Sequence, residues 1–349
     1  MKLTEAARRS GLGALGLLGG AAILRRRERF EDRAVVLAYH SVASSPDYVS
    51  EGITASPDHF DAQLAYLKAH YNVVALDELV ARISSGSLGE DRCVAITFDD
   101  GYADNCKIAL PILERHGLRA AFFVTSDPVV KGAPFWVARM HRAVNTATDF
   151  APLSELLGQK KTLKTSAAAF NAVCAKVNWM GLEDRKALIQ AAEDALQAGG
   201  ATINPAPDAF MSDPDMIRQL KDAGMIVGAH SATHPILASL DQQDLTEELR
   251  RSKSDLEALL GSSVLHMAYP NGRAIPSNID ARVVEAARDA GYLSACTSIR
   301  GAFRQGDDPL AIPRIAVNAR LGAHGFKWKL EQGFRTRAEA VPLHWRDAA

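Results

Sequence analysis

The chain has 349 residues, 47% of them hydrophobic, and a formal net charge of −1 at pH 7. This length and apolar content suffice for one large domain with a full core or for two smaller domains. Because the charge is balanced, the composition gives no reason to expect a nucleic-acid partner.

The first thirty residues differ from the rest of the chain. An apolar run over 11–24 lies between Arg8-Arg9 and the cluster 25–27 of three arginines. The run is shorter than the about 20 residues of a spanning helix, and a cleavable signal would place small residues where the arginines stand. Three interpretations remain open: a weak membrane anchor, an uncleaved or twin-arginine-like export signal, and a helix packed on the protein. We favour association with the bacterial inner membrane, on its cytoplasmic or periplasmic side.

From residue 31 onward, apolar runs alternate with helical patterns. Strands are predicted over 34–40, 93–98, 119–124, 225–230, 264–270, 292–298 and within 309–318. Helices are predicted between them over 56–71, 76–86, 106–117, 213–224, 245–260 and 280–291. Strands separated by helices predict parallel β/α units, and this many units favour a barrel over an open sheet. In such barrels the chemistry lies at the carboxyl ends of the strands.

One long interruption separates the early strands from the late ones. Residues 138–208 show helical patterns and no strand signal, which predicts a helical insertion in a barrel domain of residues 31–335. Such an insertion can cover or shape a site, but a passive role is the more common one. Residues 336–349 are interpreted as a C-terminal tail.

The four cysteines are distant from one another and show no CxxC spacing. They indicate small buried thiols rather than a disulfide framework or a zinc knuckle. They are Cys93, Cys106, Cys174 and Cys296.

The sequence TFDDGY ends a buried strand on two carboxylates, Asp99 and Asp100. Burying such a pair costs several kcal/mol unless a positive charge lies beside it. Successive side chains of a strand point to opposite faces, so the two acids suit different tasks, such as metal ligation and proton transfer.

A second polar group follows another apolar strand, in HSATHP. His230 and His234 are four residues apart, and Pro235 disfavours a regular helix, so a tight turn is expected at the strand end. Two imidazoles and one carboxylate are typical of a catalytic metal site with open positions. Either motif alone is a weak signal, but together they favour a site for a divalent cation, which would supply the missing positive charge.

These motifs resemble those of the NodB-homology polysaccharide deacetylases, which are metal-dependent carbohydrate esterases. The resemblance runs from about residue 35 to about residue 317, and FMSDPDMIRQLKDAGMIVGAHSATHP with AYPNGR resembles the exopolysaccharide branch. It implies an α/β fold, a distorted (β/α)7 barrel, that removes N-acetyl or sometimes O-acetyl groups from a sugar.

The resemblance also implies roles for individual residues. Asp99 matches the general base, Asp100 the carboxylate ligand, and His230 and His234 the imidazole ligands of the metal. Ser231 matches a residue that holds the loop by hydrogen bonding. The metal would polarise the acetamide carbonyl and activate water; Zn²⁺ is favoured, while Co²⁺, Mn²⁺ and Ni²⁺ also suit such a site. The N–H of Tyr102 is the expected donor to the oxyanion.

Two departures from the family pattern leave roles open. The late Leu-x-His motif that supplies the general acid is absent, which leaves His40 and His324 as candidates, each equally compatible with a structural or surface role. The arginine of the Arg-x-Pro-Tyr motif is replaced by Ala268. Arg314 can supply that charge to Asp99, the alternative being a surface salt bridge.

Three residues are candidates for substrate contact. Pro270 and Asn271 are expected to shape one wall of a groove, and Trp136 can stack on a sugar or belong to the core. His266, inside a predicted strand, is interpreted as a core histidine.

The expected substrate is an acetylated glycan, either a polysaccharide or a lipid-linked sugar, and the apolar run 11–24 favours one at a membrane surface. The alternatives are an inactive carbohydrate-binding or scaffold protein and an O-acetyl esterase. A two-metal phosphoesterase would require further ligands and a basic phosphate clamp, and the sequence shows neither.

Overall fold

The protein is described by a computed structural model over residues 32–44, 46–88, 92–203, 210–273, 278–317 and 322–342. The predicted membrane-associating segment, residues 1–30, and the end of the predicted tail lie outside these residues, and their roles remain predictions. Among the described helices, none has both the length and the apolar content that crossing a bilayer requires.

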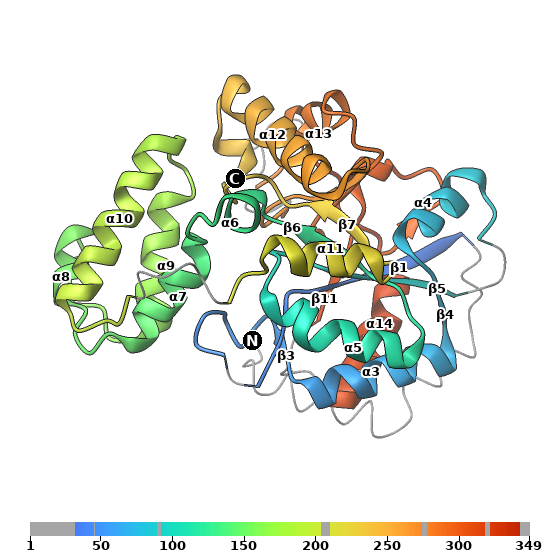
Figure 1. The fold of residues 1–349 in the computed structure, drawn as a ribbon, viewed down its shortest axis with the longest axis horizontal. Helices are drawn as coiled ribbons and strands as arrows, with labels where there is room; N and C mark the ends of the chain where they lie inside the picture. Colours follow the sequence, from blue (N-terminus) through green and yellow to red (C-terminus); the bar gives the residue numbers. More distant parts are fainter. Residues whose placement is uncertain are drawn as a thin grey trace, which may run out of the picture.

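The centre of the fold is a curled parallel sheet (Figure 1). Its hydrogen-bonded order is β1, β5, β6, β7, β8, β9, and β11 pairs with the other side of β1. The bounds are β1 Arg33–Tyr39, β5 Cys93–Phe98, β6 Ala121–Val124, β7 Ile226–Ala229, β8 His266–Ala268, β9 Ser294–Cys296 and β11 Ile315–Ala316. β5 is buried along its whole length, as its continuous apolar sequence predicts.

The segment that precedes β11 joins the two ends of this sheet. The N–H of Ile312 donates to Ala295 O, and the N–H of Thr297 donates to Ile312 O, at 2.9 and 2.8 Å. β11 then runs parallel to β1. The strands therefore curl into a distorted (β/α)7 barrel, which confirms the predicted fold class.

Helices cover the outside of the barrel (Figure 1). They are α3 Pro57–His70, α4 Leu76–Ser85, α5 Leu110–His116, α11 Pro214–Asp222, α12 Gln242–Leu260, α13 Ala281–Asp289 and α14 Gly322–Arg335. Several begin at a side chain that accepts a backbone N–H, as at Asp213 and Asp241. α3 begins at Ser56 and the following proline, which is the predicted start signal.

The predicted helix over 106–117 begins irregularly. Residues Asn105–Ala109 form a π-helical turn in which the Leu110 N–H donates to Asn105 O, and α5 continues from there. Pro111 has no N–H for a regular helical bond at this point, which is the physical reason for the wider turn.

Short strands complete the structure. They are β2 Ser41–Val42, paired with β3 Thr54–Ala55; β4 Asn72–Val73, paired with β5; and β10 Phe303–Arg304, antiparallel to β1. β10 is an antiparallel addition that the alternating β/α pattern did not predict.

The interruption between β6 and β7 folds into helices, in the stretch where a helical insertion is predicted. After the short helix α6 Ser126–Lys131, these are α7 Trp136–Thr146, α8 Ala151–Leu156, α9 Ser166–Val177 and α10 Leu182–Ala198. They lie to one side of the barrel (Figure 1) and have an apolar core of their own. A bidentate pair between Arg139 and Glu193 ties α7 to α10 at 2.9 and 2.7 Å.

Candidate active site

The first acidic motif lies at the carboxyl end of β5. The N–H of Asp99 donates to Tyr39 O at 3.0 Å, which keeps the backbone extended through Asp99. Asp100 then takes a positive φ of 79° and Gly101 one of 89°. This turn directs the two carboxylates to different partners, as the alternation of a strand predicts.

The second motif forms a tight turn at the carboxyl end of β7. The N–H of His230 donates to Val124 O at 2.8 Å, and the backbone then turns with φ of 59° at Ser231 and 60° at His234. The Ser231 hydroxyl accepts the N–H of His234 at 3.1 Å, the holding contact expected for that serine. All non-glycine residues with positive φ in the described part are Asp100, Ser231, His234 and Asn271. Such backbone strain often gathers at functional sites.

Asp100, His230 and His234 come together as a group. One ligand atom from each lies within 4.8 Å of the others, and both imidazole Nε2 atoms are 3.4 Å from Asp100 Oδ1. His230 Nδ1 lies 2.8 Å from Ala268 O, so its protonated nitrogen faces that carbonyl and its Nε2 lone pair faces the group. One carboxylate oxygen and two imidazole nitrogens are a donor set that fits a divalent transition metal.

The charges of this group favour a cation at its centre. Burial would raise the pKa of Asp100, but hydrogen bonds with the two histidines hold it well below the ordinary value. Burial lowers the pKa of His234, which favours the neutral imidazole that ligates a metal. The pKa of His230 is raised by Asp100 and Asp99 against the effect of burial. A buried carboxylate thus attracts positive charge to the histidine nitrogens, which a metal ion can supply in place of a proton.

Asp99 faces a different partner. Arg314 donates to both of its carboxylate oxygens at 2.7 Å, and the two side chains are 3% and 2% exposed. The guanidinium is itself held by Thr97 Oγ1 and Thr297 O at 3.0 and 2.8 Å. The structure therefore places Arg314 in the contact predicted from its sequence position, and the surface salt bridge weighed as the alternative is wrong.

His40 also lies at Asp99, at the carboxyl end of β1. Its Nε2 is 3.8 Å from Asp99 Oδ2, and its Nδ1 is buried without a hydrogen-bond partner among the described residues. The ring is partly exposed, so it is accessible to a bound molecule. A histidine beside a buried carboxylate is suitably placed to carry a proton.

The remaining predicted residues differ in how close they come to this group. The backbone N–H of Tyr102 has no acceptor among the described residues. On either side of it, the Ala103 N–H donates to Phe210 O and the Ser212 N–H donates to Gly101 O. Pro270 is buried and Asn271 is exposed, both just beyond β8, whose Ala268 carbonyl touches His230. These positions lie at the same end of the barrel as the acids and histidines.

Two predicted site residues are corrected. Trp136 is 8% exposed, belongs to the core of the insertion and has Arg185 over its ring at 5.0 Å, so it offers no free face to a sugar. His324 is exposed in the first turn of α14, and in the described part of the chain no hydrogen bond or ion pair joins it to the acids or histidines. The aromatic character of Trp136 did not indicate whether its ring is buried, and the late position of His324 in the chain did not indicate where its side chain points.

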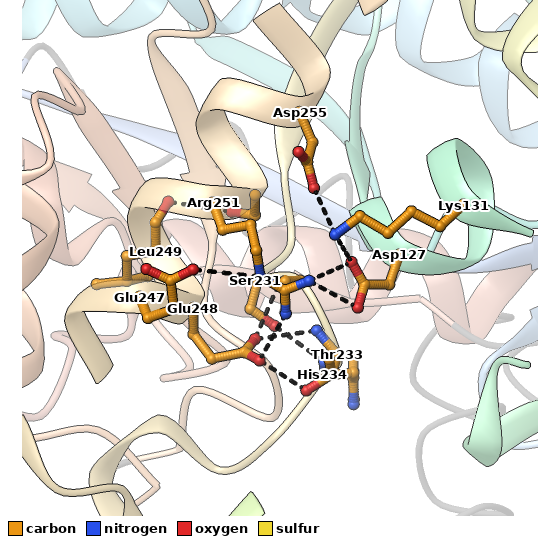
Figure 2. A network of polar contacts seen from close by, with 12 residues as sticks. Asp127, Lys131, Ser231, Thr233, His234, Glu247, Glu248, Leu249, Arg251 and Asp255 are labelled. Carbon is orange, nitrogen blue, oxygen red and sulfur yellow. Dashed lines mark hydrogen bonds and ion pairs between the residues drawn. The ribbon is translucent and has the colours of Figure 1, made fainter. Parts of the chain in front are cut away.

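Sequence reasoning missed the side chains that hold the histidine turn. The carboxylate of Glu248, on α12, accepts the N–H groups of Ala232 and Thr233 at 2.9 Å each, as Figure 2 shows for the surrounding network. Arg251, one turn further on, approaches Glu248 at 3.5 Å and pairs with Asp127 at 2.6 Å. In the sequence, Glu248 is one charged residue in a helix rich in charges, and nothing there distinguishes it as buried.

Comparison with a protein family identifies a matching pattern in two segments. The family described as "Polysaccharide deacetylase" matches residues 87–148 and 186–295. The first segment contains both acids and the second both histidines. The unmatched stretch between the segments lies within the helical insertion.

Individual relatives agree with this match. "Putative polysaccharide deacetylase YxkH" of Bacillus subtilis is 30% identical over 95 residues, which are 27% of this chain and 32% of that protein. The chain therefore spans about a third of the length of this curated relative.

Solved structures share the fold over most of the chain. Streptococcus pyogenes deacetylase PplD in complex with acetate has a TM-score of 0.55 at 19% identity, over 86% of this chain and 98% of that one. IcaB from Ammonifex degensii has 0.54 at 20%, over 86% and 97%. The de-N-acetylase from Aggregatibacter actinomycetemcomitans has 0.57 at 18%, over 86% and 100%. At these identities the likeness establishes the fold.

Proposed function

The chain belongs to the polysaccharide deacetylase family, and on that premise we propose that it is a metal-dependent hydrolase that removes N-acetyl groups from the amino sugars of a glycan. The observation that carries this proposal is the pairing of two buried acids with different partners. Asp100 lies with His230 and His234, while Asp99 is held by Arg314. One acid is thereby available as a ligand and the other as a base.

The proposed metal site consists of Asp100, His230 and His234. When bound there, a divalent cation would polarise the acetyl carbonyl and lower the pKa of water. Zn²⁺ is the favoured ion, and Co²⁺, Mn²⁺ or Ni²⁺ suits the same donors.

The residues of the chain would then carry the remaining steps. Asp99 would accept a proton from water as the water oxygen bonds to the acetyl carbon, and the Tyr102 N–H would donate to the carbonyl oxygen as it gains charge. His40 would give a proton to the sugar nitrogen as the C–N bond breaks. The products are acetic acid, which ionises to acetate by releasing its proton to solvent, and a free amino sugar; Asp99 then gives up the proton it took and His40 regains one, so atoms and charge balance.

The proposal is tested by acetate release from N-acetylated amino-sugar oligosaccharides. The full-length chain is compared before and after a chelator and after Zn²⁺ or Co²⁺ is restored. We expect activity to fall by about 100-fold or more without metal and to return with it. Activity that survives chelation would contradict the metal-dependent mechanism. Metal binding without acetate release would favour a binding or scaffold role, and release from O-acetylated sugars alone would favour an esterase.

Replacing His40 with glutamine is expected to lower kcat/KM by about 100-fold, because the leaving nitrogen loses its proton donor. The affinity for metal should not change, since His40 is not among the three ligands. The measurements are kcat/KM on an N-acetylated oligosaccharide and a metal titration of the same preparation.

His324→Gln is the matched control, because it removes the other candidate histidine from an exposed position. It should retain full activity. If it loses activity and His40→Gln does not, the assignment of the acid is wrong.

A further inference from the structure

A positively charged side chain of the insertion contacts the histidine turn of the barrel. Arg185 lies in the first turn of α10, and its Nη2 donates to Thr233 O at 3.2 Å and to His234 O at 2.8 Å. The side chain is 5% exposed and covers the Trp136 ring. A side chain of the insertion therefore contacts the backbone carbonyl of His234, one of the proposed metal ligands.

The turn is held from both sides by opposite charges. The Glu248 carboxylate accepts the N–H groups of Ala232 and Thr233. The Arg185 guanidinium donates to the carbonyl oxygens of Thr233 and His234. Within the turn, His234 keeps its φ of 60°, a conformation that costs a non-glycine residue free energy unless its surroundings impose it. The two charged groups are the surroundings that impose it.

Arg185 is not placed there by an ion pair. In the described ranges, no carboxylate lies within 4.0 Å of its nitrogens, and its hydrogen bonds go to the two carbonyls of the turn. Burial lowers the pKa of Arg185 to about 10, against the attraction of Glu248 beyond the turn. Keeping a desolvated cation here costs more than packing an apolar side chain would, so its contacts point to a role at the turn.

We propose that Arg185 is a positioning residue that holds the ligand His234 in place, so that the helical insertion sets the metal affinity of the site. The inference rests on the proposed function, because it takes Asp100, His230 and His234 as metal ligands. Arg185 lies one residue before the second segment of the family match, which begins at 186. It belongs to the stretch that the family pattern does not cover.

The experiment is a metal titration of the full-length chain, followed by calorimetry and by the visible absorption of bound Co²⁺. Arg185→Met should weaken Co²⁺ binding by about 10-fold to 100-fold and change the absorption spectrum, as loss of a partner that orients a ligand does. Arg185→Lys should bind within about threefold of wild type, because one ammonium can donate to both carbonyls. If the methionine variant does not fold, Arg185→Gln replaces it with the same expected loss.

Arg139→Met is the matched control. It breaks the bidentate pair with Glu193 between α7 and α10 and so disturbs the insertion without touching the turn. Its affinity for Co²⁺ should equal that of the unaltered protein. Equal losses in both variants, or no loss in Arg185→Met, would overturn the inference. A wild-type chain that binds no metal would instead refute the proposed function.

Discussion

Replacing Asp99 with asparagine is expected to lower kcat for acetate release by about 1000-fold while the affinity for Zn²⁺ or Co²⁺ stays within about threefold of wild type. Asp99 lies outside the group of three proposed ligands, and its carboxylate is paired with Arg314. An asparagine amide fills the same space but cannot take a proton from water. The measurements are steady-state kinetics on an N-acetylated oligosaccharide and a metal titration of the same preparations.

The neighbouring acid is the comparison that separates the two roles. Asp100→Asn removes the one carboxylate of the group and should weaken metal binding by more than about 100-fold, with activity lost in proportion. Equal loss of metal in both variants would show that Asp99 is a ligand as well. Full activity of Asp99→Asn would exclude it as the base.

Replacing Arg314 with methionine should lower the free energy of unfolding by about 3–5 kcal/mol, because it leaves a buried carboxylate without its partner. Urea unfolding at neutral pH, followed by fluorescence, measures this loss. The same variant should also lower kcat, since Asp99, the proposed base, loses the contact that orients it.

The dependence on pH distinguishes the charge of Arg314 from mere packing. Burial alone would raise the pKa of Asp99, but the charge of Arg314 and its hydrogen bonds hold that pKa below the ordinary value. The pair therefore contributes its full stabilisation above the pKa that Asp99 has in the unfolded chain. This contribution is lost as pH falls through the pKa that Asp99 has in the folded protein. In Arg314→Met the pKa of Asp99 rises. The acidic limb of kcat should move to higher pH, and the loss of stability should shrink as pH falls.

Arg92→Met is a matched control at the opposite end of β5. Arg92 also holds a carboxylate in two bonds, to Glu331 at 2.9 and 2.8 Å, and Glu331 is fully buried. Its loss should destabilise the protein without shifting the pH profile of kcat. A shift in both variants would mean that general loosening, and not the charge at Asp99, moves the profile.

The barrel and its acidic and imidazole groups could be predicted because their signals are local. Alternating apolar and helical segments indicate β/α units, and TFDDGY and HSATHP each follow an apolar run within a few residues. Since parallel strands end at one face of a barrel, the two motifs had to meet. Pro235 likewise predicted the tight turn, through a restriction on its immediate neighbour.

The supporting contacts could not be predicted, because they join positions that no local pattern connects. Arg185 meets His234 across 49 residues and Glu248 meets Ala232 across 16, each from within a helix whose charges look solvent-exposed in sequence. The role of Trp136, a sugar contact or a place in the core, stayed open in the sequence for the same reason, since only the packing of the insertion shows which faces of its ring are covered. Burial of a polar or aromatic side chain is a property of the assembled fold.

The way the barrel closes has a consequence for the order in which the protein is made. The segment at Ile312 bonds to β9, and β11, which follows it, pairs with β1 at the other end of the sheet. Arg314 in this segment reaches Asp99 across 215 residues of sequence. A ribosome therefore releases Asp99 long before Arg314, the cation that pairs with both of its oxygens. Until then, burying β5 would strand a charge in the interior. Closure of the barrel and the pairing of the buried Asp99 carboxylate with Arg314 thus depend on the same late segment of the chain.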